Sequence, residues 1–374
     1  MRVAIVSESF LPHVNGVTNT VRHVADRLLE RGHEVLIVAP GPGLPVYRSV
    51  RVVRVRSVAM PRHRTFSVGL PDAAVERTLE EFRPDVVHLA SPIALGAVGL
   101  RAARRLGVPT VAVYQTDIGG FARQYGVRAE GAVGRWVGRI HRRADRTLVP
   151  SRASWDQLTA LGVTDLHLWR RGVATDLFGP EHRQQQLNAR WTRREPGSLA
   201  VGYVGRLAPE KQVGRLAEVA AVPRTRMVVV GDGPSRASLQ RAMPGAVFTG
   251  MLRGEDLAQV FASLDVFVHT GESETYCQTV QEAQASGVPA VAPAVGGPLD
   301  LIDHGRNGLL YDAADPGSLR DTVVRLVGDR ELRRSLAAAG LATVAGRTWA
   351  SVVDELIDVH YAAVLVPGRP AFAA

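Results

Sequence analysis

Short runs of residues typical of buried strands alternate along this chain with segments of helical periodicity, and this alternation constrains the fold more than any other feature. Residues 3–6 and 34–39 are two such runs, and the segment 17–31 between them carries valine and leucine at helical spacing before Gly32. The other strands expected in this half are residues 52–55, 85–89, 110–114 and 146–150. Val- and Ile-rich strands joined by such helices indicate a parallel sheet covered on both faces.

The pattern stops at a polar stretch, 181–198, which has no clear apolar period and is interpreted as a linker. The pattern then restarts, and the strands expected there are residues 199–204, 227–230, 246–249, 266–269 and 288–293. The segment 349–366 has helical character and is expected to pack back on the first domain. The chain is therefore predicted to be α/β, with doubly wound parallel-sheet domains at 1–180 and 199–348.

The length and the cysteine content narrow the class of protein. At 374 residues the chain is too long for one core and suits two domains of ordinary size. Its single cysteine, Cys277, excludes an intramolecular disulfide framework and fits a reducing compartment. No apolar run approaches the roughly 20 residues that span a bilayer, and the N-terminus lacks the layout of a signal peptide. We expect a cytoplasmic protein without a membrane span; peripheral contact with the inner face of the membrane stays open.

The formal net charge of +9 is concentrated in the first half of the chain. Residues 1–190 carry 27 arginines and 16 acidic residues, whereas 191–374 carry 18 basic and 20 acidic residues. A basic half fits an anionic lipid surface, nucleic acid or an acidic substrate, although any Arg-rich chain is basic where its acids are fewer. Lys211 is the only lysine beside 44 arginines, which favours a need there for a compact ammonium rather than a planar guanidinium.

Ligands of open parallel sheets bind where strands end and loops lead into helix N-termini, and the distinctive loops of this chain lie there. Gly16 precedes the first helix, where a ligand can approach the backbone and an anion meets the helix dipole, although a capped turn gives the same pattern. Arg206 and Lys211 follow strand 199–204 and can bracket a diphosphate. Gly231-Asp232-Gly233 is interpreted as a tight turn, because a lone Gly-x-Gly is weak evidence for a dinucleotide site.

The strongest signal is the segment 271–282, GESETYCQTVQE, which follows strand 266–269 and leads into a helix that ends near Gly287. Glu274 is expected in the loop, and Glu282 about two turns inside the helix. Such carboxylates accept hydrogen bonds from sugar or ribose hydroxyls, and the helix N-terminus between them can hold phosphate oxygens. The alternative is that the loop carboxylates only favour the helix dipole and Glu282 is exposed.

With these residues the chain resembles the retaining GT-B glycosyltransferases of family 4, and among them the actinobacterial mannosyltransferases that act on lipid glycoconjugates. The resemblance covers nearly the whole chain and is carried by ESFLPHVNGV, DVVHLASP, YQTD, RRGVATDLF, GRLAPEK, GESETYCQTVQEA and NGLL. Glu274 and Glu282 match the family's E-x7-E element. The resemblance implies two Rossmann-like domains that face a central cleft. It also implies transfer of a hexose from a nucleotide-sugar to a hydroxyl.

The resemblance also implies roles for the matching residues. Arg206 and Lys211 would neutralise the donor diphosphate as it leaves, and Glu274 would contact the donor sugar. Glu282 would bind the ribose hydroxyls. The remaining donor contacts would be Asn15, Gly16, Met251, Leu252, Tyr276, Cys277, Gln278 and Thr279, with Met251 and Leu252 near the base. Asp117 would be catalytic, at the sugar and acceptor side of the cleft, where His13 and Gln115 would also lie.

Two positions depart from the family's pattern. Many relatives carry histidine where Gln115 stands, and glutamine cannot act as a general base at neutral pH. Tyr276-Cys277 replaces the commoner Phe-Gly, so a cysteine side chain must fit close to the phosphates. Cys277 is not expected to be a nucleophile, because nothing in its sequence neighbourhood supplies a base.

The chain contains no Asp-x-Asp, the usual carboxylate pair for a diphosphate-bound metal ion, so we expect neither a metal nor another cofactor. Fixed cations and helix N-termini would then stabilise the leaving diphosphate while the acceptor attacks from its side. GDP-mannose is the preferred donor. UDP-glucose and UDP-N-acetylglucosamine stay open, as does a UDP-sugar enzyme with a small-molecule or natural-product acceptor.

The acceptor and the partners are less constrained. The stretch 128–146 offers a cationic face with apolar anchors to an anionic membrane, and the alternative is a solvated helix with its apolar side in the core. The residues of that face are Arg135, Trp136, Arg139, Ile140, Arg142 and Arg143. An epimerase or hydrolase and a non-catalytic nucleotide-sugar-binding protein remain rivals. A nicotinamide dehydrogenase is disfavoured because no strand is followed by a full GxGxxG, and no motif supports nucleic-acid binding.

Overall fold

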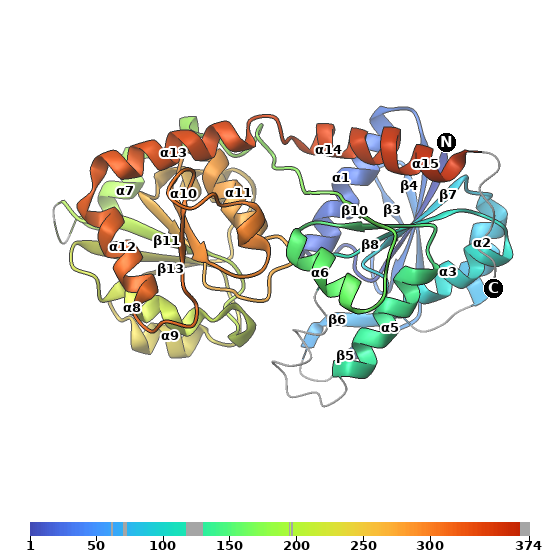
Figure 1. The fold of residues 1–374 in the computed structure, drawn as a ribbon, viewed down its shortest axis with the longest axis horizontal. Helices are drawn as coiled ribbons and strands as arrows, with labels where there is room; N and C mark the ends of the chain where they lie inside the picture. The colour runs from blue at the N-terminus through green and yellow to red at the C-terminus, as the bar shows by residue number, and fades with distance from the viewer. Residues whose placement is uncertain (61–62, 70–72, 117–129, 194, 196, 367–374) are drawn as a thin grey trace. The chain divides into compact units, whose positions relative to one another are not determined.

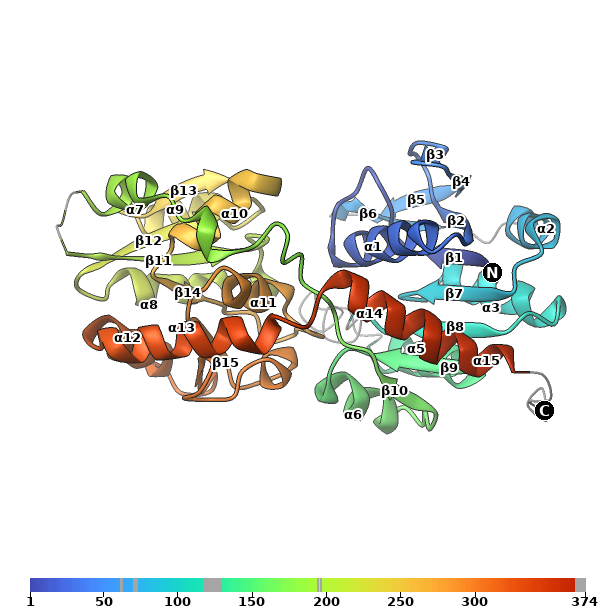
Figure 2. The same ribbon diagram turned by 90° about the horizontal axis from the view of Figure 1, so that it is seen from above.

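The computed structural model describes residues 1–366 except 61–62, 70–72, 117–129, 194 and 196, and it divides the chain into two compact units. Unit 1 comprises Met1–Arg171 and Trp349–Ala374, and unit 2 comprises Gly172–Thr348. Each unit is built on a mainly parallel sheet with helices on both faces (Figures 1 and 2). This architecture confirms the predicted α/β fold class.

The large sheet of unit 1 has eight strands in the order β10-β9-β8-β7-β1-β2-β4-β3, and only the β3–β4 pairing is antiparallel among its described pairs. Its strands are β1 (Arg2–Ser7), β2 (Glu34–Pro40), β3 (Val46–Tyr47), β4 (Val50–Val55), β7 (Val86–Ala90), β8 (Thr110–Val113), β9 (Arg146–Val149) and β10 (Leu166–Leu168). A separate hairpin consists of β5 (Ser57–Met60) and β6 (His63–Gly69). The helices of unit 1 are α1 (Gly16–Glu30), α2 (Ala73–Phe82), α3 (Leu95–Arg105), α5 (Glu130–Arg143), α6 (Arg152–Ala160), α14 (Trp349–Glu355), a π-helical turn (Leu356–Tyr361) and α15 (Ala362–Leu365).

The C-terminal helices of unit 1 are fixed against α1 and the sheet by charged and polar contacts. Asp354 accepts hydrogen bonds from Arg27, with Nη2 2.7 Å from Oδ2. Further along the C-terminal segment, the buried Tyr361 hydroxyl lies 2.8 Å from Nδ1 of His88 on β7. A segment far from α1 in sequence therefore completes the layer of helices beside it.

Unit 2 has a six-stranded sheet, entirely parallel in its described pairs, in the order β13-β12-β11-β14-β15-β16. Its strands are β11 (Leu199–Val204), β12 (Thr225–Val230), β13 (Val247–Gly250), β14 (Val266–Val268), β15 (Ala290–Pro293) and β16 (Leu309–Tyr311). Its α-helices are α7 (Gln185–Thr192), α8 (Leu216–Ala220), α9 (Arg236–Ala242), α10 (Gly254–Ser263), α11 (Gln278–Ala285), α12 (Ser318–Gly328) and α13 (Arg330–Val344). The short 3-10 turns are Pro180–His182, Pro209–Lys211, Val213–Arg215 and Gly297–Asp300. Two apolar clusters form its core, one shared with α10 and α11 and the other with α8 and α12.

The boundary between the units differs from the linker predicted at 181–198. Unit 2 begins at Gly172, and the predicted linker contains the helix α7. Trp191 of α7 is 5% exposed and packs in the core of unit 2 with Leu187 beside it. Their spacing of four residues gives α7 a narrow apolar stripe, too short to stand out from the polar residues around it.

Candidate functional site

Three loops meet at the carboxyl edge of the unit 2 sheet, after β11, β12 and β14. The amide of Leu207 in the first loop donates to the carbonyl oxygen of Asp232 in the second, at 2.9 Å. A Cβ on Gly233, whose φ is 156°, would lie 2.3 Å from the carbonyl oxygen of Leu207. Gly231-Asp232-Gly233 is therefore a turn that packs on its neighbour, and glycine allows the close approach.

Lys211 and Glu274 come together between the loops after β11 and β14. Nζ of Lys211 lies 2.5 Å from Oε1 of Glu274, and Nε2 of His269 lies 3.2 Å from the same oxygen. The hydroxyl of Thr270 donates a hydrogen bond to the carbonyl oxygen of Lys211 at 2.6 Å and so fixes the backbone of the β11 loop. Two cationic groups thus fix one carboxylate oxygen, and Oε2 has no partner among the residues that the structure describes.

Charge pairing keeps these three groups ionised. Burial disfavours the charged form of each, but the mutual attraction outweighs it. The pKa of Glu274 is held well below its usual range by Lys211 and His269, and the pKa of Lys211 is raised by Glu274. The pKa of His269 is raised to about 10 because Cys277 and Glu274 outweigh the burial of the imidazole. The cluster therefore presents fixed positive charge at neutral pH.

His269 is a functional candidate that the sequence analysis missed, because it treated this residue as the end of a strand. The structure ends β14 at Val268 and leaves His269 at the sheet edge, 3% exposed. Tyr203 stacks on the imidazole with ring centroids 6.4 Å apart, and a Cβ on Gly271 would lie 2.9 Å from both Nε2 of His269 and Oε1 of Glu274. A polar residue closing a Val/Phe strand, two residues before a glycine, is the signal that could have indicated it.

The helix α11 begins at Gln278, directly after Cys277, which is buried and has a left-handed backbone with φ of 76°. Glycine adopts this conformation without strain, which explains why the family's usual residue at this position suits the turn. Tyr276 is 2% exposed and lies against Gly297, while the Gln278 side chain donates to the Gly172 carbonyl oxygen at 2.7 Å. Cys277 also interacts with His269, but this imidazole is protonated at neutral pH and so does not serve as a base for the thiol.

Glu282 lies about one turn into α11, not two as predicted, because the helix begins only at Gln278. Its side chain is partly buried and has no hydrogen-bond or ion-pair partner within the described part of the chain. Burial alone raises the pKa of Glu282 to about 8. The alternative of an exposed glutamate is therefore wrong, and the carboxyl group is available to accept ligand hydroxyls.

Replacing Glu282 with glutamine should stabilise the ligand-free protein at high pH. The folded pKa lies above the unfolded value of 4.5, so the native state binds more protons, and wild-type stability falls as pH rises through about 8. Because Glu282 is partly exposed, we expect a gain of about 2 kcal/mol at pH 9, or roughly 5 °C in Tm, and almost none at pH 4.5. Thermal unfolding at both pH values checks this, and equal gains at both would contradict it.

Arg206 shares the β11 loop with Lys211 but contacts a different carboxylate. Its Nη1 lies 3.1 Å from Oε1 of Glu210, and its side chain is 39% exposed. The two cations are therefore held by different acids, and the side chain of Lys211 is the less exposed of the two, at 28%. The predicted cation pair therefore shares one loop, and Glu210 is an orienting residue that the sequence analysis did not select.

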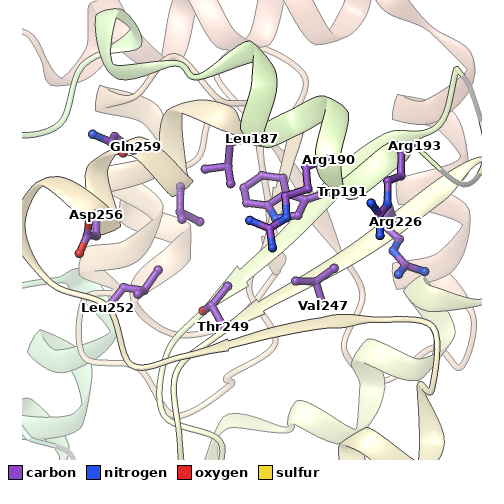
Figure 3. A pocket seen from close by; sticks show the side chains of 11 residues that line it. Leu187, Arg190, Trp191, Arg193, Arg226, Val247, Thr249, Leu252, Asp256 and Gln259 are labelled. Atoms are coloured by element: carbon purple, nitrogen blue, oxygen red, sulfur yellow. The ribbon is translucent and has the colours of Figure 1, made fainter.

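Met251 and Leu252 follow β13 at the same edge of the sheet. Met251 is 63% exposed, and its sulfur lies 3.4 Å from Nη2 of Arg253. Leu252 is partly buried and lines a pocket together with Thr249 (Figure 3). Their role at the base of a donor stays a prediction.

In unit 1 the predicted residues lie around the N-terminus of α1. Asn15 caps this helix by accepting from the amide of Thr18 at 2.9 Å, and its own amide group donates to Ser9. A Cβ on Gly16 would meet no atom within 4 Å, so the backbone there borders open space. Asn15 is therefore occupied in shaping the turn, while Gly16 leaves room for a ligand.

The predicted acceptor residues of unit 1 have different surroundings. Gln115 is buried and accepts from Nη2 of Arg171 at 3.1 Å, and Arg171 also donates to Thr20 of α1. Arg171 is only 7% exposed and was not singled out by the sequence analysis. His13 is partly exposed, and Asp117 lies outside the described residues.

The helix α5 covers the described part of the stretch 128–146 and has both buried and exposed residues, and its contact with a membrane stays a prediction. Ile140 is 3% exposed and packs in the core, so it is not an anchor for a membrane. Trp136 is 38% exposed, and its Nε1 donates to the carbonyl oxygen of Ile93 at 2.8 Å. A groove of about 690 Å³ runs between α3 and α5 and is lined by Arg101, Arg104, Arg105, Arg139, Arg142 and Arg143. Among the described helices, none combines the length and apolarity that crossing a bilayer requires.

Comparison with known proteins agrees with this geometry. Residues 14–177 match the model of glycosyltransferase family 4, and residues 198–329 match that of glycosyl transferases group 1. The chain is 51% identical to a GDP-mannose-dependent alpha-mannosyltransferase of Mycobacterium tuberculosis, over 97% of each protein. It is 43% identical to one of Corynebacterium glutamicum, over 98% of this chain and 89% of that protein. Among solved structures, Anabaena HepE in complex with UDP is similar in fold, with a TM-score of 0.79, 19% identity and coverage of 97% and 100%.

Proposed function

The chain belongs to glycosyltransferase family 4 and is a glycosyltransferase with the GT-B fold, and we propose that it moves mannose from GDP-mannose to a hydroxyl of a glycoconjugate. The observation that carries the proposal is the Lys211–Glu274 contact at the carboxyl edge of unit 2, with His269 on the same carboxylate oxygen. The named activity of relatives that are 43% and 51% identical over nearly their whole length supports the donor.

The reaction retains the configuration at the anomeric carbon. The bond from C1 of mannose to the diphosphate oxygen breaks, a bond from C1 to the acceptor oxygen forms on the same face, and the acceptor proton passes to the leaving diphosphate. Negative charge grows on the diphosphate as the sugar gains oxocarbenium character. Lys211 and Arg206 stabilise that charge as preorganised cations, so the step needs neither a metal ion nor a base at Gln115.

The remaining groups of unit 2 orient the donor. Because Lys211 and His269 both hold Oε1 of Glu274, Oε2 is left to accept a hydroxyl of the mannosyl group. Glu282, which lacks a protein partner among the described residues, accepts the ribose hydroxyls and becomes charged when they bind. The first amides of α11 face the phosphates, where the helix dipole favours negative charge.

A transfer assay tests this function. The purified protein is incubated with radiolabelled GDP-mannose or UDP-glucose and a lipid extract, with and without EDTA. We expect label to move to glycolipid from GDP-mannose, with the same rate in EDTA. Faster transfer from UDP-glucose would contradict GDP-mannose as the donor. Loss of transfer in EDTA would contradict the metal-independent mechanism. Donor binding without transfer would favour a non-catalytic nucleotide-sugar-binding protein.

The acceptor side of the proposal is a peripheral contact with an anionic membrane through the groove between α3 and α5. Six arginines line this groove, and only one of them, Arg105, has an ion pair with a described acid, Glu76. Such a surface attracts phosphate head groups over a distance set by ionic strength. This contact would bring the protein to a lipid-linked acceptor.

The double variant Arg101→Gln and Arg139→Gln should bind vesicles that contain phosphatidylglycerol about 10-fold more weakly than wild type. Each arginine near an anionic surface contributes about 1 kcal/mol to binding, and salt screens part of the second contribution. Both side chains are exposed on the groove. Sedimentation at low salt measures the effect. Arg320→Gln, an exposed change on α12 in the other unit, is the matched control and should bind like wild type. Equal sedimentation of all three proteins would contradict the contact.

A further inference from the structure

The pocket of unit 2 that Thr249 and Leu252 line is a cavity of about 520 Å³, along the β13 edge of the sheet between α7 and α10 (Figure 3). It reaches from Leu252, after the end of β13, to Arg226, near the beginning of β12. Parallel strands carry the Lys211–Glu274 cluster at their carboxyl ends, whereas Arg226 lies near the amino end of its strand. A strand of this length spans roughly 15 to 20 Å, so the far end of the cavity is distinct from the donor site.

Three arginines line the cavity, and Figure 3 shows Arg193 and Arg226 side by side at one end, with Arg190 nearer the middle beside Trp191. Arg190 belongs to α7, Arg193 caps its C-terminus, and Arg226 belongs to β12. None of the three has a hydrogen bond or an ion pair with a described residue, and Nε of Arg226 is shielded from solvent without a partner. By contrast, Arg183, just before α7, donates to Asp265 at 2.7 Å. The cavity is thus lined by three guanidinium groups that no described acid neutralises.

Like charges that line one cavity repel one another, and the repulsion is strongest for Arg226, whose Nε is shielded from solvent. A bound anion removes this cost, and the guanidinium fork matches the oxygens of a phosphate with two parallel hydrogen bonds. This end of the cavity therefore selects a phosphate group or an anion of the same geometry.

The rest of the cavity indicates what the phosphate is attached to. Trp191 and Val247 provide an apolar floor beside the arginines. Asp256 and Gln259 lie at the opposite end, three residues apart on α10 and so on one side of that helix (Figure 3). A carboxylate and a carboxamide can accept and donate hydrogen bonds to several hydroxyls. The volume is in the range of small-ligand sites.

We propose that this cavity binds a sugar phosphate, with the phosphate on Arg190, Arg193 and Arg226 and the sugar hydroxyls toward Asp256 and Gln259. The site is built entirely from unit 2. Of its lining residues, Leu252 is also predicted to contact the donor base, whereas the phosphate end lies at the amino end of the strands, away from that contact.

Calorimetric titration with mannose 6-phosphate, glucose 6-phosphate, inorganic phosphate and free mannose tests the proposal. The wild-type protein, saturated with GDP so that the donor site is filled, should bind at least one sugar phosphate 10-fold or more tighter than phosphate or mannose. Arg190→Gln, an exposed change on α7, and Arg226→Gln should each weaken this binding at least 10-fold, and Arg320→Gln should leave it unchanged.

Asp256→Asn separates the two ends of the cavity. It should reduce the preference for the sugar phosphate over inorganic phosphate and leave the affinity for inorganic phosphate the same. The proposal is overturned if no sugar phosphate binds in the presence of GDP, or if binding survives Arg190→Gln in a protein with wild-type Tm. Equal affinities for phosphate and sugar phosphates would overturn the assignment of the hydroxyl end.

Discussion

Replacing Lys211 with alanine should lower kcat/KM for mannosyl transfer by about 1,000-fold, or about 4 kcal/mol. Its Nζ lies 2.5 Å from Glu274, so the change removes the counter-charge of a buried carboxylate as well as a cation that faces the leaving diphosphate. Loss of a preorganised charge acts mainly on the transition state, so we expect most of the effect in kcat. Steady-state kinetics with varied concentrations of GDP-mannose measure kcat and KM.

Lys211→Arg is the control for charge. It keeps the cation but replaces a compact ammonium with a planar fork, and we expect an intermediate loss of about 10-fold. A Lys211→Ala protein with near-wild-type kcat would contradict the catalytic role of this residue. A Lys211→Arg protein as inactive as the alanine variant would mean that shape, rather than charge, dominates.

Replacing Glu274 with glutamine should reduce kcat/KM by about 100- to 1,000-fold, comparable to removing one preorganised polar group from an active site. The amide keeps the shape of the side chain, but it leaves the charges of Lys211 and His269 without their shared anion. Glutamine can still accept one hydrogen bond, so the donor should bind in a disturbed orientation. Kinetics with GDP-mannose, with the Tm measured in parallel, check the prediction.

Glu272 offers a matched control in the same loop. Its side chain is 39% exposed, and its Oε1 lies 3.9 Å from Nη1 of Arg215, outside the cluster. Glu272→Gln should therefore retain activity within about 2-fold, since exposed ion pairs contribute little. If Glu272→Gln and Glu274→Gln lose activity equally, the loop as a whole, and not the carboxylate at Lys211, is what matters.

The sequence was sufficient to predict the parts of the fold that depend on strong periodicity. Strands such as β1 and β11 are six-residue, mostly apolar runs buried on both faces, and α1 has a clear apolar stripe with a capping asparagine before it. The edge strands β10 and β16 have only three residues each, too few for a period to be recognised. In helices with a weak apolar stripe and in short edge strands, tertiary contacts rather than the local sequence pattern determine the structure.

The candidate site, like the fold, could be predicted from the sequence only in part. Lys211 and Glu274 could be predicted because each follows a buried strand in a loop of unusual composition, and parallel topology brings such loops to one edge. Their direct contact could not be predicted, since 63 residues separate them. His269 was hidden because a single buried histidine at a strand end is more often a core residue, and only its distance to Glu274 changes that interpretation.

The central claim is that unit 2 holds GDP-mannose through Glu282 and the Lys211–Glu274 cluster without a metal ion. Calorimetric titration of GDP-mannose and UDP-glucose in EDTA tests it most directly, with wild-type protein and Glu282→Gln compared. We expect GDP-mannose to bind wild type at least 10-fold tighter than UDP-glucose, and Glu282→Gln to weaken GDP-mannose binding about 10-fold, about 1.4 kcal/mol for a charged hydrogen bond. Tighter binding of UDP-glucose, or unchanged binding of GDP-mannose by Glu282→Gln, would contradict it.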